Sequence, residues 1–161
     1  AKIDLTSVAF VFPIKLDKKI KYIVLSHSFI PNEAKLKERM FKDKMPYDAW
    51  VRNGYITITN TEIVDQQQVM DYVLTMCKEN EWEIDTLCFD PANAGKLMMD
   101  LSNEGYDVEE VYQSVKSLNE STAGFREQVY EGNIIHLPNP VLDFAMANAV
   151  SKLTRMQRRK R

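Results

Sequence analysis

Residues 84–94 read Ile-Asp-Thr-Leu-Cys-Phe-Asp-Pro-Ala-Asn-Ala, and this stretch decides the fold class. Ile84 to Phe89 is a short apolar run typical of a buried strand. Asp90 followed by Pro91 is a strong signal for the start of a helix, which we predict over Ala92 to Asn103. A buried strand that passes directly into a capped helix is the repeating unit of α/β proteins.

The chain downstream repeats this unit. Strands are predicted at Val108–Tyr112 and Ile134–Leu137, and helices at Ser117–Tyr130 and Val141–Leu153. Alternating strands and helices favour parallel strands with helices packed on the faces of the sheet.

Upstream, two β-branched and aromatic runs indicate an antiparallel hairpin. They are Leu5–Ile14, broken at Pro13, and Tyr22–Ile30, with a long polar connection at Lys15–Lys21. An antiparallel hairpin joined to parallel strand–helix units makes a mixed sheet. We therefore predict a three-layer α/β fold with helices on both faces of the sheet, which is the layout of RNase H-like folds.

Between these two parts the pattern is helix, turn, strand, helix. A helix is predicted over Glu33–Lys44, an aromatic turn at Tyr47–Val51, a strand at Tyr55–Thr59, and a further helix capped by Asp65. No proline- or glycine-rich linker divides the chain. We predict one domain over residues 1–151 and a basic tail over residues 152–161.

Composition is that of an ordinary soluble globular protein, with 45% hydrophobic and 27% charged residues among 161. No apolar run approaches the ~20 residues of a membrane span, and no secretion signal is recognisable. We expect a cytoplasmic protein without a membrane partner. Cys77 and Cys88 are predicted to be two reduced core thiols, and the cysteines and histidines have no zinc-ligand spacing.

The net charge of −2 does not indicate a nucleic-acid binder, but the charge is unevenly distributed. No acid follows Asp143. The last ten residues carry Lys152, Arg155, Arg158, Arg159, Lys160 and Arg161. Such an arm either binds phosphates through counterion release or is a solvated terminus, and the sequence leaves both readings open.

Asp90 is the best candidate for a catalytic or metal-ligating residue, because catalytic groups of α/β proteins collect at the carboxyl ends of strands. The same residue is an ideal helix cap, and the two roles can coexist. Asp4 is the second candidate: it precedes the first strand and lies beside Asp90 if the two strands are neighbours, or otherwise belongs to a solvated terminus. Two-metal phosphodiester hydrolysis with Mg²⁺ or Mn²⁺ needs several convergent carboxylates.

The segment Ser114–Thr122 is rich in hydroxyls and amides and precedes a helix, whose cap we predict near Ser121. Helix N-termini bind phosphate readily, so Lys116 and Asn119, with Arg126 on the same surface, are candidate DNA contacts. His136 lies at a strand end and is a further candidate. His27 lies within an apolar strand pattern and is predicted to be structural.

Phosphate-loop, dinucleotide-binding, serine-hydrolase and zinc-protease motifs are absent. Many segments in order nevertheless resemble the nuclease half of phage terminase large subunits from Gram-positive hosts. They include Asp4-Leu5-Thr6-Ser7-Val8, Ser26-His27-Ser28-Phe29-Ile30-Pro31, Gly54–Thr61, Leu87–Ala94, Gly105–Val108, Leu118–Ser121, Tyr130–Asn133 and Asn139-Pro140 through Asn148-Ala149.

The resemblance implies an RNase H-like nuclease that cuts double-stranded DNA with Mg²⁺ or Mn²⁺ in the cytoplasm of a bacterial host, encoded by a phage or prophage. It implies that Asp90 is catalytic, and that the portal and the small terminase subunit are partners. The family's first catalytic acid lies in a Gly-x-Asp-Leu-Ser segment before Asp4, and its last lies downstream of Ala149. The packaging ATPase portion is also absent.

We therefore expect a truncated nuclease domain. It is either a metal-dependent endonuclease weakened by the loss of catalytic acids, or a non-catalytic prophage remnant that binds DNA or a packaging protein.

Overall fold

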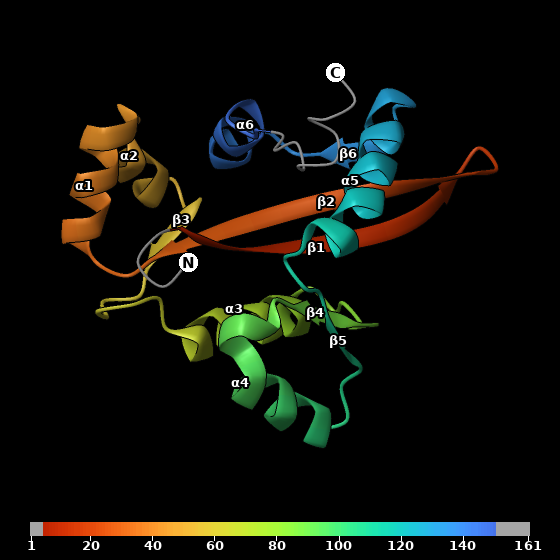
Figure 1. The fold of residues 1–161 in the computed structure, drawn as a ribbon, viewed down its shortest axis with the longest axis horizontal. Helices are drawn as coiled ribbons and strands as arrows, with labels where there is room; N and C mark the ends of the chain where they lie inside the picture. Colours follow the sequence, from red (N-terminus) through yellow and green to blue (C-terminus); the bar gives the residue numbers. More distant parts are fainter. Residues whose placement is uncertain (1–4, 151–161) are drawn as a thin grey trace, which may run out of the picture.

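The computed structural model describes residues 5–150 of the 161-residue chain (Figure 1). In chain order the elements are β1 (Thr6–Leu16), β2 (Lys19–Ile30), α1 (Glu33–Asp43), α2 (Tyr47–Arg52), β3 (Ile56–Ile58), α3 (Gln66–Glu79), β4 (Leu87–Phe89), α4 (Pro91–Asn103), β5 (Val108–Glu110), α5 (Val115–Tyr130), β6 (Ile134–His136) and α6 (Pro140–Ala147).

The predicted hairpin is present, but its connection is far shorter than expected. β1 and β2 pair antiparallel from Thr6 opposite Phe29 to Leu16 opposite Lys19. The turn consists of Asp17 and Lys18, with φ angles of 50° and 66°. Two consecutive residues with positive φ match the twist of the flanking strands. The lysine-rich segment therefore lengthens the strands, and the prediction of a long polar loop was wrong.

Strand β2 is the centre of a mixed sheet. Its second edge carries two parallel partners. The pairing with β3 begins where Ser28 lies opposite Ile56, and the pairing with β6 begins where Tyr22 lies opposite Ile134. Strands β4 and β5 pair parallel with each other. Within residues 5–150 they form a separate two-stranded sheet, whereas the sequence predicted a single sheet.

One face of the mixed sheet is covered by α1, α2 and α6. The buried cluster there consists of Ile30, Leu36, Tyr47, Trp50, Ile56 and Val141. Phe144 of α6 completes it, with its ring centroid 5.9 Å from that of Trp50. The segment predicted as an aromatic turn is thus a short helix, because Tyr47 and Trp50 lie one turn apart and are both buried against the sheet.

Tyr47 carries the main polar contact of this core. Its side chain is fully buried, and its hydroxyl donates a hydrogen bond of 2.7 Å to Asp43 Oδ2. Arg39 pairs with the same carboxylate oxygen at 2.8 Å. Burial, together with the hydrogen bond to Asp43, raises the pKa of Tyr47 to about 12. The phenol therefore stays a neutral donor at any physiological pH.

The opposite face of the hairpin is covered by α3 and the turn after it. Tyr72 stacks on His27 with ring centroids 4.4 Å apart, and Trp82 lies 5.4 Å from Phe10 and 4.9 Å from Phe12. Figure 1 shows α3 and α4 on one side of the hairpin and α6 on the other. The predicted mixed α/β fold with helices on both faces is confirmed.

Several predicted boundaries and one cysteine need correction. Helix α5 begins at Val115, because Ser114 rather than Ser121 caps it by accepting a 3.1 Å hydrogen bond from the Ser117 amide. Helix α6 ends at Ala147, and not at Leu153. Cys77 is buried as predicted, but Cys88 is exposed, because successive side chains of a strand alternate between its faces and the neighbours Leu87 and Phe89 are the half-buried ones.

Within residues 5–150 no helix is both long and apolar enough to cross a membrane.

The burial of β2 generates a stability prediction with a control on the same strand. Ile30 is fully buried, whereas Ile20 is 57% exposed near the hairpin turn. Ile30→Ala should lower the free energy of unfolding by about 2–5 kcal/mol, because it removes packed methyl groups and leaves a cavity. Ile20→Ala should change it by less than about 0.5 kcal/mol. Urea unfolding of both variants measures the difference, and equal losses would contradict this packing.

Candidate functional site

Asp90 lies where the sequence places it, at the carboxyl end of β4 and the start of α4. Its Oδ1 accepts a hydrogen bond of 3.1 Å from the Ala92 amide, so the capping role is confirmed. The side chain is exposed, and within the described chain its Oδ2 has no hydrogen-bond partner. One carboxylate oxygen therefore holds the helix while the other faces solvent, where it can accept a ligand.

Asp4 lies outside the described residues, so its position relative to Asp90 stays a prediction. The sequence placed Asp4 beside Asp90 only if the first strand and β4 were neighbours, and these two strands do not pair directly within residues 5–150. In the described chain β1 pairs only with β2, and β4 only with β5. The neighbouring Leu5 packs against the core formed by α1, α2 and α6.

A metal centre is not formed by the described residues. Between residues 5 and 150 there is no group of three or more His, Cys, Asp or Glu side chains that could hold an ion. Mg²⁺ and Mn²⁺ prefer several oxygen ligands, and Asp90 supplies one. The described residues on their own do not fit a divalent cation.

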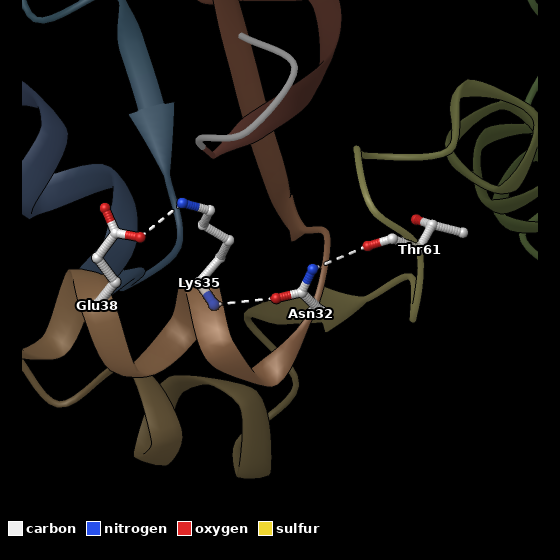
Figure 2. A network of polar contacts seen from close by, with 4 residues as sticks. All are labelled: Asn32, Lys35, Glu38 and Thr61. Atoms are coloured by element: carbon white, nitrogen blue, oxygen red, sulfur yellow. Dashed lines mark hydrogen bonds and ion pairs between the residues drawn. The ribbon is translucent and has the colours of Figure 1, made fainter.

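The carboxyl ends of β2 and β3 are joined by a polar network (Figure 2). Asn32 caps α1 by accepting a 3.0 Å hydrogen bond from the Lys35 amide, and its own amide donates at 3.0 Å to the Thr61 carbonyl. Lys35 pairs with Glu38 at 2.6 Å. Asn32 thus ties the loop after β3 to the start of α1. These groups form hydrogen bonds and an ion pair with one another, so the network has a structural role.

Two surface depressions lie away from Asp90. One, of about 720 Å³, lies beside the network and is lined by Asn32, Glu33, Ala34, Asn60, Thr61 and Glu62. The other, of about 380 Å³, lies between α3 and α4 and is lined by Gln67, Met70, Leu74, Leu97, Asp100, Leu101, Asn103 and Glu104. Each is lined by two acidic side chains and by no basic one, and this negative charge disfavours phosphate binding.

The three candidate DNA contacts of α5 lie on one face of that helix. Lys116, Asn119 and Arg126 are exposed, and their spacings of three and seven residues place them in line. The same alternation of three- and four-residue steps along α5 adds Ala123 and Tyr130 to this face. Tyr130, 78% exposed, was not singled out from the sequence, although the three-four spacing could have found it.

The cations of this face are available to a ligand. Arg126 lies over the ring of Tyr130, with Cζ 5.7 Å from the ring centroid. In the described chain neither Lys116 nor Arg126 has a carboxylate within 4.0 Å. The pairs that do form there are Lys35–Glu38, Arg39–Asp43 and Arg52–Asp48.

The two histidines differ in burial. His27 is buried, hydrogen-bonds through Nε2 to Thr57 Oγ1 at 2.7 Å and stacks on Tyr72, so its structural interpretation is confirmed. Burial lowers the pKa of His27. His136 is exposed on β6, and its Nδ1 donates to the Leu137 carbonyl at 3.0 Å. That bond leaves Nε2 free of protein partners in the described chain, and phosphate contact by His136 stays a prediction.

The chain matches a family model described as "Terminase large subunit, endonuclease domain" over residues 1–160. This chain belongs to that family. A curated relative, the terminase large subunit of Enterobacteria phage HK97, is 30% identical over an alignment that covers 71% of this chain and 23% of the relative.

A solved structure has a fold similar to that of this terminase endonuclease domain. The domain superposes on the crystal structure of the HK97 bacteriophage large terminase with a TM-score of 0.72 and 24% identity, and the match covers 88% of this chain and 29% of that one. The likeness supports the RNase H-like fold. The domain spans about a quarter of the length of the relatives it matches.

Two substitutions separate the helix-capping hydrogen bond of Asp90 from its negative charge. Asp90→Ala should lower the free energy of unfolding by about 1 kcal/mol, because the Ala92 amide loses its acceptor. Asp90→Asn should preserve stability, since asparagine caps as well as aspartate. Thermal and urea unfolding check both variants. Equal destabilisation by Asn and Ala would mean that the charge, and not the hydrogen bond, stabilises this helix end.

Burial of His27 generates a pH prediction. Its pKa is lowered in the folded state from the ordinary value of 6.5, so the unfolded state binds more protons between the two pKa values. The free energy of unfolding should therefore fall as the pH drops below about 6.5 and level off below the lowered pKa. Urea unfolding from pH 7.5 to 5.0 measures this loss. His27→Gln should remove that part of the pH dependence, and an unchanged slope would contradict it.

Proposed function

We propose that this domain is a divalent-metal-dependent endonuclease that cuts double-stranded DNA during phage DNA packaging. Asp90, supported by Asp4, is its proposed catalytic and metal-ligating residue, and Mg²⁺ or Mn²⁺ is its cofactor. The observation that carries the proposal is the exposed, half-free Asp90 carboxylate at the carboxyl end of β4, in a chain of the endonuclease family. Catalytic groups of α/β proteins collect at such strand ends.

The described residues alone do not form a cation site, so the metal dependence rests on the family and on the chemistry of Asp90. A divalent cation supplies positive charge against the anionic phosphate. Asp90 is suited to such a role because the Ala92 amide restrains one oxygen and thereby orients the carboxylate. A second acid is proposed to come from outside the described residues, and Asp4 is the candidate.

DNA binding is proposed for the face of α5 formed by Lys116, Asn119 and Arg126. At 1.5 Å per residue, Lys116 and Arg126 lie roughly 15 Å apart along the helix, comparable with the ~12 Å width of the DNA major groove. In the described chain neither cation lies within 4.0 Å of a carboxylate. Such cations bind phosphates by releasing counterions. His136 is proposed as an additional phosphate contact.

The proposed partners and location are based on the same family. We propose that the domain acts in the cytoplasm of a bacterial host, encoded by a phage or prophage, with the portal and the small terminase subunit as partners. ATP-driven packaging is not proposed for this stretch, which spans only about a quarter of the relatives' length.

A second candidate function is a non-catalytic module that holds DNA or docks on a packaging protein. Two observations favour it: the described residues form no metal-binding group, and α5 still presents unpaired cations. This module would keep the DNA affinity of α5 without cutting. The two candidates differ in their dependence on Asp90.

Cleavage of supercoiled plasmid tests the endonuclease directly. With Mn²⁺, the domain should nick the plasmid, and EDTA should abolish nicking. Asp90→Asn should reduce it by at least about a hundredfold, because a carboxylate charge is lost while the helix cap is retained. Asp65→Asn is the matched control, since Asp65 also caps a helix, accepting from the Gln67 amide at 2.9 Å.

Nicking that persists in Asp90→Asn would overturn the catalytic assignment. No nicking by the folded wild-type domain, together with DNA binding, would favour the non-catalytic module.

The salt dependence of DNA affinity tests the α5 contact. Each of Lys116→Gln and Arg126→Gln should weaken binding and reduce the slope of log K against log [salt] by about 0.9, the value for one phosphate contact on duplex DNA. Arg52→Gln is the matched control, because Arg52 is paired with Asp48 at 2.8 Å on a different surface helix. Fluorescence anisotropy with a labelled duplex measures both quantities. Unchanged slopes would place the DNA elsewhere.

A further inference from the structure

We propose that Tyr130 is a positioning residue for DNA binding, which holds the Arg126 guanidinium over its ring and so keeps it extended toward a phosphate. The inference rests on the proposed DNA contact of α5. It adds a residue that neither the sequence pattern nor the family assigned.

The geometry of the pair supports this role. Tyr130 follows Arg126 by four residues on α5, and the guanidinium carbon lies 5.7 Å from the ring centroid. Residues four apart on a helix are neighbours on its surface. A guanidinium within about 6 Å of an aromatic ring face is attracted by the ring's electrons, and arginine stacks on rings without losing its outward N–H donors.

The ring does not serve the protein core. Tyr130 is 78% exposed, and no residue of α5 is buried. An exposed aromatic ring whose contact is a cation on the same helix face is suited to orient that cation.

The other arginines of the described chain, Arg39 and Arg52, have a carboxylate at the position where Arg126 has Tyr130 or one turn to the other side. Arg39 has Asp43 four residues on, and Arg52 has Asp48 four residues before; each makes an ion pair of 2.8 Å. At Arg126 the residues four before and four after are Thr122 and Tyr130, and those three before and after are Ala123 and Val129. None is acidic, so on this helix the guanidinium lies against a ring and not against a carboxylate.

This difference matters for a phosphate ligand. A carboxylate that orients an arginine also competes with phosphate for its donors, whereas a ring orients it through the guanidinium face. The edge, which carries the N–H groups, remains available for a bidentate phosphate contact. Together with Lys116 and Asn119, the restrained Arg126 completes a row of ligand-accessible donors along α5.

A double-mutant cycle tests the inference with a labelled 30-base-pair duplex and fluorescence anisotropy at fixed salt. Tyr130→Leu should weaken binding about two- to fivefold, the equivalent of an exposed cation–π contact, while Tyr130→Phe should bind like the wild type because it keeps the ring. In the Arg126→Gln background, Tyr130→Leu should have no further effect. Tyr112→Leu is the control, since Tyr112 is also exposed but lies before α5.

Three results would overturn the inference. Full affinity in Tyr130→Leu would mean that the ring does not position Arg126. An equal loss in the Arg126→Gln background would mean that the ring contacts DNA on its own. A loss in Tyr130→Phe equal to that in Tyr130→Leu would assign the effect to the hydroxyl. If Lys116→Gln and Arg126→Gln weaken binding but Tyr130→Leu does not, the DNA contact stands and only the role of Tyr130 fails.

Discussion

The backbone of β2 is hydrogen-bonded along both edges, and the rest of the structure depends on that arrangement. Its amides alternate in direction, so one set pairs with β1 while the other points to the second edge. There the Tyr22 amide donates to Asn133 at 2.8 Å and the Ser28 amide to Tyr55 at 3.3 Å. Buried backbone groups must be paired, so this strand needs β3 and β6, which arrive from distant parts of the chain. The helices that cover each face are brought in by these connections.

The same alternation explains why Pro13 does not break β1. Pro13 lies opposite Tyr22, whose amide points away from β1 toward Asn133. Opposed residues of an antiparallel pair share this orientation, so the nitrogen of Pro13 faces the outer edge of β1, where it loses no bond to β2. Sequence reading treated this proline as a strand breaker because it had no means of knowing which residue would lie across from it.

Two of the helix caps were readable from the sequence, whereas the pairing of strands distant in the chain was not. The caps at Asp65 and Asp90 were predicted because a carboxylate needs only the amide two residues on. The structural role of His27 followed from its apolar strand. The separation of β4 and β5 from the mixed sheet, and with it the exposure of Cys88, was missed, because a three-residue strand carries no information about its neighbours. The candidate site divides in the same way: Asp90 is set by its own helix, whereas a ligand set needs residues from several strands.

Asp90 and α5 place two different demands on electrostatics, and the structure meets them at different places. Asp90 lies at the N-terminus of α4, where the Ala92 amide occupies only one of its two carboxylate oxygens. The proposed DNA contact on α5 needs positive charge, and no acid lies three or four residues from Arg126. An acid close to Arg126 would have strengthened the helix by a few tenths of a kcal/mol. Placing Tyr130 there instead gives up that small gain and leaves the Arg126 cation without an ion pair on this helix, as the proposed DNA contact requires.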